Sequence, residues 1–316
     1  MSKIALLIGI DDYANAPLSG CVNDATRMSE LLRSHHDNSP NFDCRRLLSS
    51  EERITRPRLK QAVESLFSKP ADIALFFFAG HGTANNLGGY LVTQDAMRYD
   101  EGVSMTDVLS FANQSLAREK IIILDCCHSG AFGQVPAVDN NTALLKEGVT
   151  VLSASRDSEY ALETNSGGFF TSLICNALEG GAADVCGKVT IASIYAYVDE
   201  VLGGWDQRPL FKSHVSKLAS LRNCLPAVSL EILRLLPRYF KSPTYEYPLD
   251  PSYEPDAEPK HPDHEKIFGH LQKLRAARLV VPVDEDHMYF AAINSKACKL
   301  TALGTFYWHC VNRGKI

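Results

Sequence analysis

Two stretches of the chain, Ile73–Ala79 and Ile121–Leu124, are apolar at every position. A strand with one solvated face alternates apolar and polar residues, so continuous apolar runs are typical of strands that helices cover on both faces. Segments with helical periodicity lie between such runs along the first two thirds of the chain. Together these patterns predict an α/β fold with a mostly parallel sheet flanked by helices. On such sheets, catalytic groups lie at the carboxyl ends of strands.

Composition places the chain among soluble globular proteins. With 316 residues, 45% apolar and 22% charged, it can form one large domain and one small domain. The net charge of −5 gives the whole chain no electrostatic attraction to nucleic acid. The nine cysteines are scattered without a C-x-x-C pair, which favours reduced thiols. No long apolar run or signal peptide is evident, so we expect a cytoplasmic protein that does not contact membranes.

A change in composition predicts a boundary in the second half of the chain. Lys241–Asp263 holds six prolines, and six acids against two lysines, which predicts an extended linker. The module that follows carries eight basic and four acidic side chains, and its pattern of helix, strand and helix resembles a winged helix. The expected domains are a main domain over 1–225, a helix with a Pro-rich acidic linker over 226–263, and a winged-helix-like α+β domain over 264–316. In the last of these, helices are expected over 264–278 and 300–314 and a strand over 288–293.

Two predicted strands end in chemically reactive residues. The stretch "IILDCCHSG" ends one strand with Cys126, Cys127 and His128, and "FFFAGHGT" ends another with His81 between two glycines. Consecutive strand residues point to opposite faces, so the first three converge poorly on one metal ion. Cysteines also pack as small apolar side chains, and a histidine in a loop need have no role. A thiol and an imidazole at one sheet edge, however, form the arrangement in which a base activates a nucleophile.

The motifs as a set resemble the caspase-like peptidases, and among them the bacterial relatives of metacaspases. The resemblance rests on "LLIGIDDY", "GCVNDA", "FFFAGHG", "IILDCCHSG", "VLSASRDSEYALE" and "GGFFTSLICNALEGGAAD", and spans residues 4–221 in the family's order. The Q-A-C signature of animal caspases is absent, and the metacaspase form D-x-C-H-S-G is present. The resemblance implies a Cys-His dyad of Cys127 and His81, with an oxyanion hole formed by the N–H groups of Gly82 and Cys127. It implies a cysteine endopeptidase that needs no cofactor.

The same resemblance implies a preference for basic substrates. In metacaspases, the positions of Cys21, Asp24 and Asp125 line a pocket for Arg or Lys, and two acids there would attract a cation and repel Asp. Asp24 could instead compensate the dipole of the first helix, and Asp125 could order the turn before the nucleophile. The segment "SASRDSEYALE" resembles the family's cleft, which adds Ser153, Ser155 and Asp157 as candidate substrate-binding residues, although Asp157 could also be a solvated loop charge.

Further expectations concern regulation and partners. Relatives carry a processing loop after the nucleophile, and Lys146 is the basic residue in that segment here, which suggests self-cleavage after it. Some metacaspases need calcium, but no calcium-binding loop motif is present, and no metal-ligating residues are predicted. The substrate would be a protein or peptide with a basic residue before the cleaved bond, in a bacterial signalling, defence or cell-death pathway. The small domain would bind a partner protein or, weakly, nucleic acid. The alternative is a nucleic-acid-binding or scaffold regulator with an inactive caspase-like domain.

Overall fold

The computed structural model describes residues 2–85, 88–98, 100–126, 138–139, 142–143, 145–154, 163–164, 167–202 and 209–316. The chain forms two compact units. The first consists of Met1–Ala183 and Lys188–Cys224, and the second of Asp184–Gly187 and Leu225–Ile316. In the described ranges, no helix is both long and apolar enough to cross a membrane.

A six-stranded sheet forms the centre of the first unit. Its strands run in the order β14-β10-β7-β3-β1-β2, and each neighbouring pair from β10 to β2 is parallel, while β14 is antiparallel to β10. These strands are β1 (Lys3–Gly9), β2 (Asp43–Leu48), β3 (Ile73–Gly80), β7 (Glu119–Cys126), β10 (Val149–Ser153) and β14 (Leu210–His214). Every residue of β3 and β7 is buried, as expected for central strands covered on both faces.

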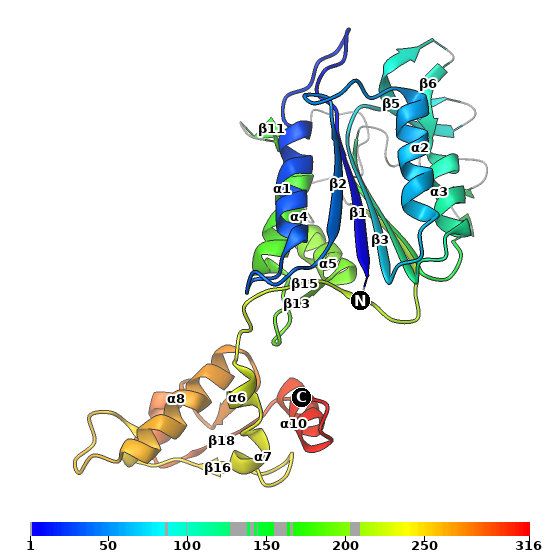
Figure 1. The fold of residues 1–316 in the computed structure, drawn as a ribbon. Coiled ribbons are helices and arrows are strands. Elements are labelled where there is room, and N and C mark those ends of the chain that lie inside the picture. Colours follow the sequence, from blue (N-terminus) through cyan, green and yellow to red (C-terminus); the bar gives the residue numbers. More distant parts are fainter. Residues whose placement is uncertain are drawn as a thin grey trace. The chain divides into compact units, whose positions relative to one another are not determined.

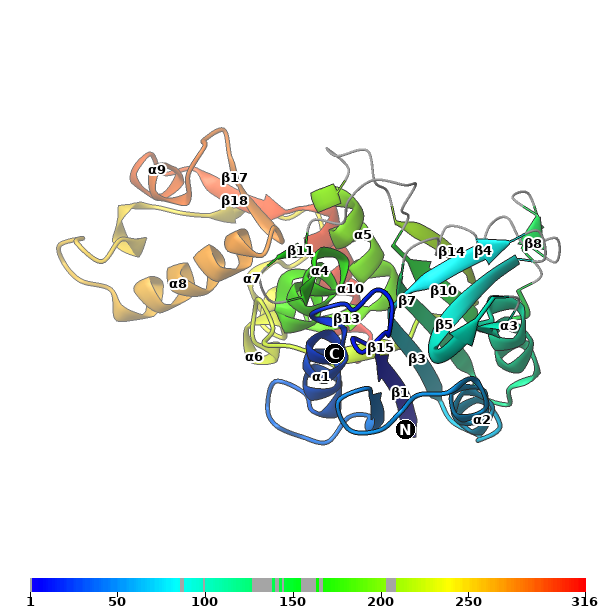
Figure 2. The same ribbon diagram turned by 90° about the horizontal axis from the view of Figure 1, so that it is seen from above.

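Helices cover both faces of this sheet (Figures 1 and 2). On one face lie α2 (Arg56–Phe67) and α3 (Met105–Gln114), and on the other lie α1 (Cys21–Arg33), α4 (Phe169–Asn176) and α5 (Ile191–Leu202). Alternate residues of each strand pack into one or the other of the two cores. The prediction of a mostly parallel sheet flanked by helices is therefore confirmed.

Short elements complete the first unit. They are the antiparallel sheet of β4 (Gly82–Asn85), β5 (Gly88–Met97) and β6 (Asp100–Ser104), the pairs β8 (Val138–Asp139) with β9 (Thr142–Ala143), β11 (Glu163–Thr164) with β12 (Gly167–Gly168), and β13 (Lys188–Thr190) with β15 (Ser220–Asn223), and one π-helical turn, η2 (Ala177–Gly181). The helix α2 begins after Thr55, with Pro57 in its first turn, where the missing N–H of proline costs no helical hydrogen bond.

The second unit has its own core and a separate three-stranded antiparallel sheet in the order β16-β18-β17. Its elements are α6 (Leu230–Leu233), α7 (Leu236–Tyr239), β16 (Tyr247–Pro248), η3 (Pro251–Tyr253), α8 (Pro262–Ala276), β17 (Val280–Val283), α9 (Met288–Ile293), β18 (Ala297–Leu300) and α10 (Ala302–Asn312). The unit is thus α+β, and both long helices expected from the sequence are present. Its likeness to a winged helix stays a prediction.

The expectation of an extended linker over Lys241–Asp263 is wrong. This segment contributes β16 to the sheet, and Leu249 and Tyr253 are buried in the core of the second unit. Proline at the edge of a sheet and at the start of a helical turn is tolerated, because no backbone N–H is needed there. The few aromatic and aliphatic residues between the prolines are sufficient to anchor the segment.

The predicted strand over 288–293 is also wrong, because these residues form the helix α9. Met288, Ala291 and Ala292 are buried, whereas Tyr289 and Phe290 are about half exposed. Burial at positions i, i+3 and i+4 is the pattern of a helix. A run of six apolar residues is too short to distinguish the two structures by composition, and the helical spacing of its small residues was the useful signal.

Candidate active site

The candidate site is built at the carboxyl ends of β3 and β7. These strands are parallel neighbours, and their register pairs Ala79 with Asp125 and Gly80 with Cys126. His81 therefore follows one member of a matched pair, and Cys127 follows the other in the sequence. Cys127 itself lies outside the described residues. The expectation that "GHG" and "DCCHSG" end neighbouring strands at the same edge is confirmed by this register.

The side chain of His81 has a defined orientation. Its Nε2 lies 2.7 Å from the carbonyl oxygen of Ala16, and its ring lies against the ring of Tyr13, with centroids 4.6 Å apart. A carbonyl oxygen can only accept, so Nε2 carries the proton in this contact. In a neutral imidazole, Nδ1 is then the nitrogen that can take up a further proton.

The backbone of His81 is held on both sides. Its N–H donates to the hydroxyl oxygen of Tyr13 at 3.0 Å, and its carbonyl accepts from the N–H of Val92 at 3.0 Å. The Tyr13 hydroxyl in turn donates to the carbonyl of Val92 at 3.2 Å. Tyr13 is 8% exposed, and burial raises the pKa of its hydroxyl, which therefore stays protonated and able to donate.

Gly80 makes room for Tyr13. A Cβ atom at this position would lie 2.5 Å from the Tyr13 hydroxyl oxygen, which is closer than any real contact. The glycine before His81 is thus required by the close approach of a residue 67 positions earlier in the sequence. Sequence reasoning identified the glycines around His81 but did not identify Tyr13 as its support.

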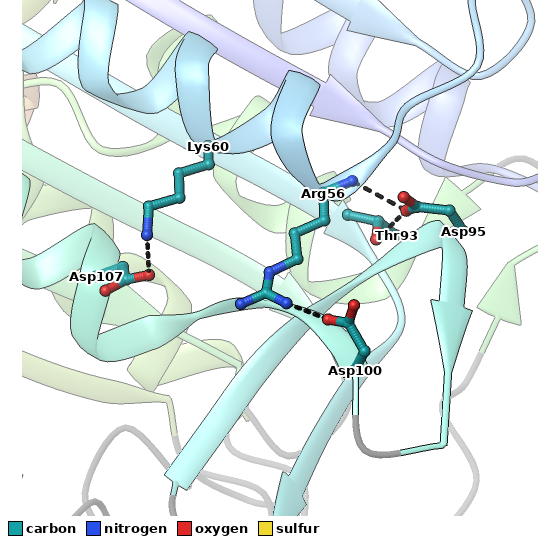
Figure 3. A network of polar contacts seen from close by, with 6 residues as sticks. All are labelled: Arg56, Lys60, Thr93, Asp95, Asp100 and Asp107. Carbon is teal, nitrogen blue, oxygen red and sulfur yellow. Dashed lines mark hydrogen bonds and ion pairs between the residues drawn. The ribbon is translucent and has the colours of Figure 1, made fainter.

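The hairpin that follows His81 is fastened to the helices beside it (Figure 3). Asp95 on β5 accepts from the backbone N–H of Arg56 at 2.9 Å and from the hydroxyl of Thr93 at 2.7 Å. The guanidinium of Arg56 pairs with Asp100 on β6. Beside it, the ammonium of Lys60 on α2 lies 2.8 Å from the carboxylate of Asp107 on α3, which joins the two helices. A carboxylate from the hairpin thus caps α2 in place of the usual side chain at Thr55, which makes no capping bond.

Two of the predicted pocket residues, Asp24 and Asp125, converge on one point. Asp24 Oδ2 accepts from the backbone N–H of Gly168 at 2.8 Å, and a Cβ atom on Gly168 would lie 2.5 Å from Asp125 Oδ2 and 3.2 Å from Asp24 Oδ2. The φ of Gly168 is −66°, which any residue adopts, so space rather than backbone conformation excludes a side chain here. Asp24 and Asp125 are 5% and 6% exposed, and they form a buried acidic pair.

The electrostatics of the pair are unusual for aspartates. The pKa of Asp24 is raised to about 7, chiefly by burial and further by the carboxylates of Asp125 and Asp11, against the effect of the Gly168 N–H. Burial, together with Asp11, Asp125 and Asp24, also raises the pKa of the Cys21 thiol. Cys21 therefore stays a neutral thiol beside three acids. The predicted group of Cys21, Asp24 and Asp125 is brought together by the fold.

Asp11 is a site residue that sequence reasoning missed. Its two carboxylate oxygens accept from the backbone N–H groups of Cys21 at 2.8 Å and Val22 at 3.2 Å, which are the first two residues of α1. It thus caps the helix that carries Asp24. An acid directly after β1, ten residues before a helix start without a capping side chain of its own, was the signal that could have identified it.

The other predicted site residues are placed as follows. Gly82 is the first residue of β4 and pairs with Leu91. Ser155 and Asp157 lie outside the described residues. Ser153 is fully buried, and its hydroxyl has no hydrogen-bond partner among the residues that the structure describes. Its strand neighbours Leu152 and Ala154 pack in the core that contains α1 and α4, so Ser153 faces the opposite side of the sheet from Asp125. The geometry thus separates Ser153 from the acidic pair.

Lys146 lies three residues before the start of β10, in a segment held by hydrogen bonds. Its N–H donates to Asn113 Oδ1 at 2.9 Å, and its carbonyl accepts from Val149 N–H at 3.2 Å. The buried Lys120 ammonium donates to the carbonyl of Glu147 at 2.7 Å. Self-cleavage after Lys146 stays a prediction, and these bonds would have to break for it to occur.

No group of three or more His, Cys, Asp or Glu side chains suited to holding a metal ion occurs in the part of the chain that the structure describes. The acidic pair accepts hydrogen bonds from the N–H of Gly168 and the hydroxyl of Thr171. The described part of the site thus combines a strand-end imidazole with two buried acids, and in the sequence a cysteine follows the end of the neighbouring strand. These are the residue types of nucleophile-and-base chemistry.

Comparison with known proteins identifies the family. The profile of the caspase domain matches residues 2–220, which is more than half of the chain, and the chain therefore belongs to the caspase domain family. Metacaspase-1 of Plasmodium falciparum is 30% identical over 195 residues, which cover 52% of this chain and 32% of that protein. Metacaspase-3 of Trypanosoma cruzi is 24% identical over 230 residues, covering 60% of this chain and 62% of that protein.

The chain thus spans between about a third and two thirds of the length of these curated relatives. Among solved structures, a protein from Geobacter sulfurreducens superposes with a TM-score of 0.51 at 14% identity, covering 71% of this chain and all of that one. That likeness concerns the fold alone.

Proposed function

We propose that this chain is a cysteine endopeptidase that cleaves peptide bonds after Arg or Lys. The observation that carries the proposal is the register of β3 and β7, which aligns the residues before His81 and Cys127. Consecutive Cα atoms lie about 3.8 Å apart, so covalent geometry keeps the Cα atom of Cys127 within that distance of Cys126 at the end of β7. Membership of the caspase domain family supports the same reaction.

In the proposed reaction, Nδ1 of His81 takes the proton of the Cys127 thiol, and the thiolate attacks the carbonyl carbon of the substrate. The oxyanion that forms would be held by the N–H groups of Gly82 and Cys127. His81 then gives its proton to the leaving amine, and a thioester remains. Water, deprotonated by His81, hydrolyses the thioester and restores the thiol.

The contact between His81 Nε2 and the carbonyl of Ala16 has a defined part in this sequence. It orients the ring with Nδ1 as the base, and it stabilises the imidazolium while the proton is held. The hydrogen bonds that the His81 N–H donates to Tyr13 and that its carbonyl accepts from Val92 would limit backbone movement of His81 during the two proton transfers.

The acidic pair supports selection of a basic side chain. Arg27 lies one turn after Asp24, yet its guanidinium contacts Asn176 Oδ1 at 3.2 Å and Glu179 Oε1 at 2.9 Å. A substrate guanidinium or ammonium would bring a countercharge to Asp24 and Asp125, and it would make charge-assisted hydrogen bonds, which are stronger than those of a neutral donor. The pair would repel a substrate aspartate.

Hydrolysis of fluorogenic peptides tests the proposal. Peptides that differ only in Arg, Lys, citrulline or Asp before the fluorophore should be cleaved in the order basic, neutral and acidic, with the Asp peptide at least a hundredfold slower than the Arg peptide. Cys127→Ala and His81→Ala should each abolish turnover, while Cys126→Ala should retain it. Faster turnover of the Asp peptide, or undiminished activity of Cys127→Ala, would contradict the proposal.

The proposed chemistry uses acid, base and nucleophile and requires no cofactor. Turnover in excess EGTA, compared with turnover in added calcium, tests this directly. Equal rates are expected. A rate that falls in EGTA and returns with calcium would instead establish the calcium dependence that some metacaspases show.

For the second unit, we propose docking to a partner protein rather than to nucleic acid. Its twelve basic side chains are balanced by twelve acidic ones, so it has no net attraction for phosphates. Tyr289, Phe290 and Ile293 on α9 are 40–51% exposed and could contribute to such an interface. Full-length Cys127→Ala should not shift double-stranded DNA at 20 mM salt. A shift that weakens steeply with salt would favour the nucleic-acid-binding alternative.

A further inference from the structure

The carboxylate of Asp125 is held by a residue that lies 46 positions later in the sequence. Thr171 donates to Asp125 Oδ2 with its hydroxyl at 2.7 Å and with its backbone N–H at 3.3 Å. Thr171 is fully buried, at the third position of α4. Both donors reach the same carboxylate oxygen, so rotation of the carboxylate would break two hydrogen bonds at once.

The start of α4 contacts both members of the acidic pair. Gly168 precedes the helix and donates its N–H to Asp24, while Thr171 donates to Asp125. The backbone donors at the start of a helix otherwise lack partners within it, so the two carboxylates satisfy them. The arrangement stabilises the two buried acids with the dipole of α4 and with hydrogen bonds.

Thr171 belongs to a rigid part of the molecule. Phe170, Leu173 and Ile174, its neighbours on α4, pack in the core with α1 and the central sheet. A buried helix residue with a fixed rotamer can hold another side chain in place more closely than a loop residue can. The hydroxyl of Thr171 is therefore suited to setting the direction in which Asp125 presents its charge.

We propose that Thr171 is a positioning residue for the recognition of basic substrate side chains, acting through its hydrogen bonds to the carboxylate of Asp125. The inference rests on the proposed preference for Arg and Lys. Without the hydroxyl, the carboxylate of Asp125 loses its 2.7 Å contact with Thr171 and is held less firmly in its present orientation. The binding of a substrate cation then has to restore an orientation that the native protein already holds.

The substitution Thr171→Val removes the hydroxyl and keeps the side-chain shape and the backbone N–H. We expect the KM for an Arg peptide to rise about tenfold, which corresponds to about 1.4 kcal/mol. The kcat should stay within twofold, and kcat/KM for the matched citrulline peptide, which has no charge, should also stay within twofold. Thr171→Ser keeps the hydroxyl and should restore the KM of the native protein.

Thr150→Val is the matched control. Thr150 is likewise buried, at 1% exposure, and its hydroxyl lies 2.8 Å from that of Ser213 on the neighbouring strand. The same chemical change there should affect stability without altering the ratio of Arg to citrulline cleavage. Thr171→Cys keeps an atom of similar position with a weaker donor, and it should give an intermediate KM should the valine variant fold poorly.

The outcomes separate the two proposals. If the native protein does not favour the Arg peptide over the citrulline peptide, the proposed basic preference fails. If it does, and Thr171→Val keeps the same ratio of kcat/KM for the two peptides, the positioning role of Thr171 fails while the preference stands. An equal loss of kcat/KM for both peptides, matched by Thr150→Val, would likewise overturn the inference, because it would show that Thr171 contributes only to the stability of the fold.

Discussion

Replacing Asp24 with Asn should increase the free energy of unfolding of the first unit at pH 8 and decrease cleavage after Arg at the same pH. The pKa of Asp24 is about 7 in the fold against an ordinary value of 3.8, mainly because the carboxyl group is buried. The folded state therefore binds this proton more tightly than the unfolded state. The stabilisation that this bound proton gives to the folded state is complete below pH 3.8 and is lost as the pH rises through 7.

The magnitude follows from the size of the shift. About three pKa units, at about 1.4 kcal/mol each, give roughly 4 kcal/mol of free energy lost by pH 8. Asparagine remains neutral at every pH and can still accept from the N–H of Gly168. The stabilisation by Asp24→Asn should therefore reach a few kcal/mol at pH 8 and become small near pH 4. The countercharge for a basic substrate is halved, so the KM for the Arg peptide should rise more than tenfold.

Urea unfolding of the Cys127→Ala background, which prevents self-digestion, measures the free energies at pH 5 and pH 8. Because the chain has two units, two transitions are expected, and the substitution should affect the one assigned to the first unit. Asp43→Asn, a change at an exposed aspartate of β2, is the control and should produce no comparable pH-dependent difference. If Asp24→Asn lowers the free energy of unfolding equally at both pH values, ionisation of the buried Asp24 does not destabilise the fold at pH 8, and the prediction is wrong.

Three further predictions concern residues around the site and in the second unit. Gly80→Ala should displace Tyr13 and lower kcat by more than tenfold, with a loss of about 1–3 kcal/mol in unfolding free energy; thermal melting and turnover of the Arg peptide measure both, and native values would contradict the close contact. Ser153→Ala should leave turnover unchanged and stabilise the first unit by up to about 2 kcal/mol, because it removes a buried hydroxyl that has no partner among the described residues; a raised KM would show that Ser153 binds substrate. Leu249→Ala should destabilise the second unit by about 2–4 kcal/mol in urea unfolding, because Leu249 is buried in its core. An unchanged transition would show that Lys241–Asp263 does not contribute to this core.

Much of the fold was predictable because the central strands carry an unambiguous pattern. The continuous apolar runs before His81 and Asp125 allow only a buried, parallel arrangement, and this fixed the sheet edge where the site lies. Prediction failed where short segments depend on tertiary contacts. Leu249 is isolated among prolines and acids, and nothing local indicates that a core elsewhere in the chain will bury it.

The candidate site shows the same division. Asp24 and Asp125 were predicted from their motifs, and the register of two strands brings the second of them next to Ala79. Asp11, Tyr13 and Thr171 were missed because each acts through a hydrogen bond to a residue between 10 and 68 positions away. Such partners have no local signature, since the spacing between donor and acceptor is set by loop lengths and not by a helical or strand period.

The buried acids connect these observations. Two carboxylates in a low-dielectric pocket repel one another, and a protein that needed them only for stability would do better with neutral side chains. Here, the helix starts of α1 and α4 supply N–H and O–H donors to Asp11, Asp24 and Asp125, while the nearby guanidinium of Arg27 contacts Glu179. The donors lower the cost of burial without cancelling the charge. Under the proposed preference, a substrate Arg or Lys side chain would supply the countercharge that these donors do not supply.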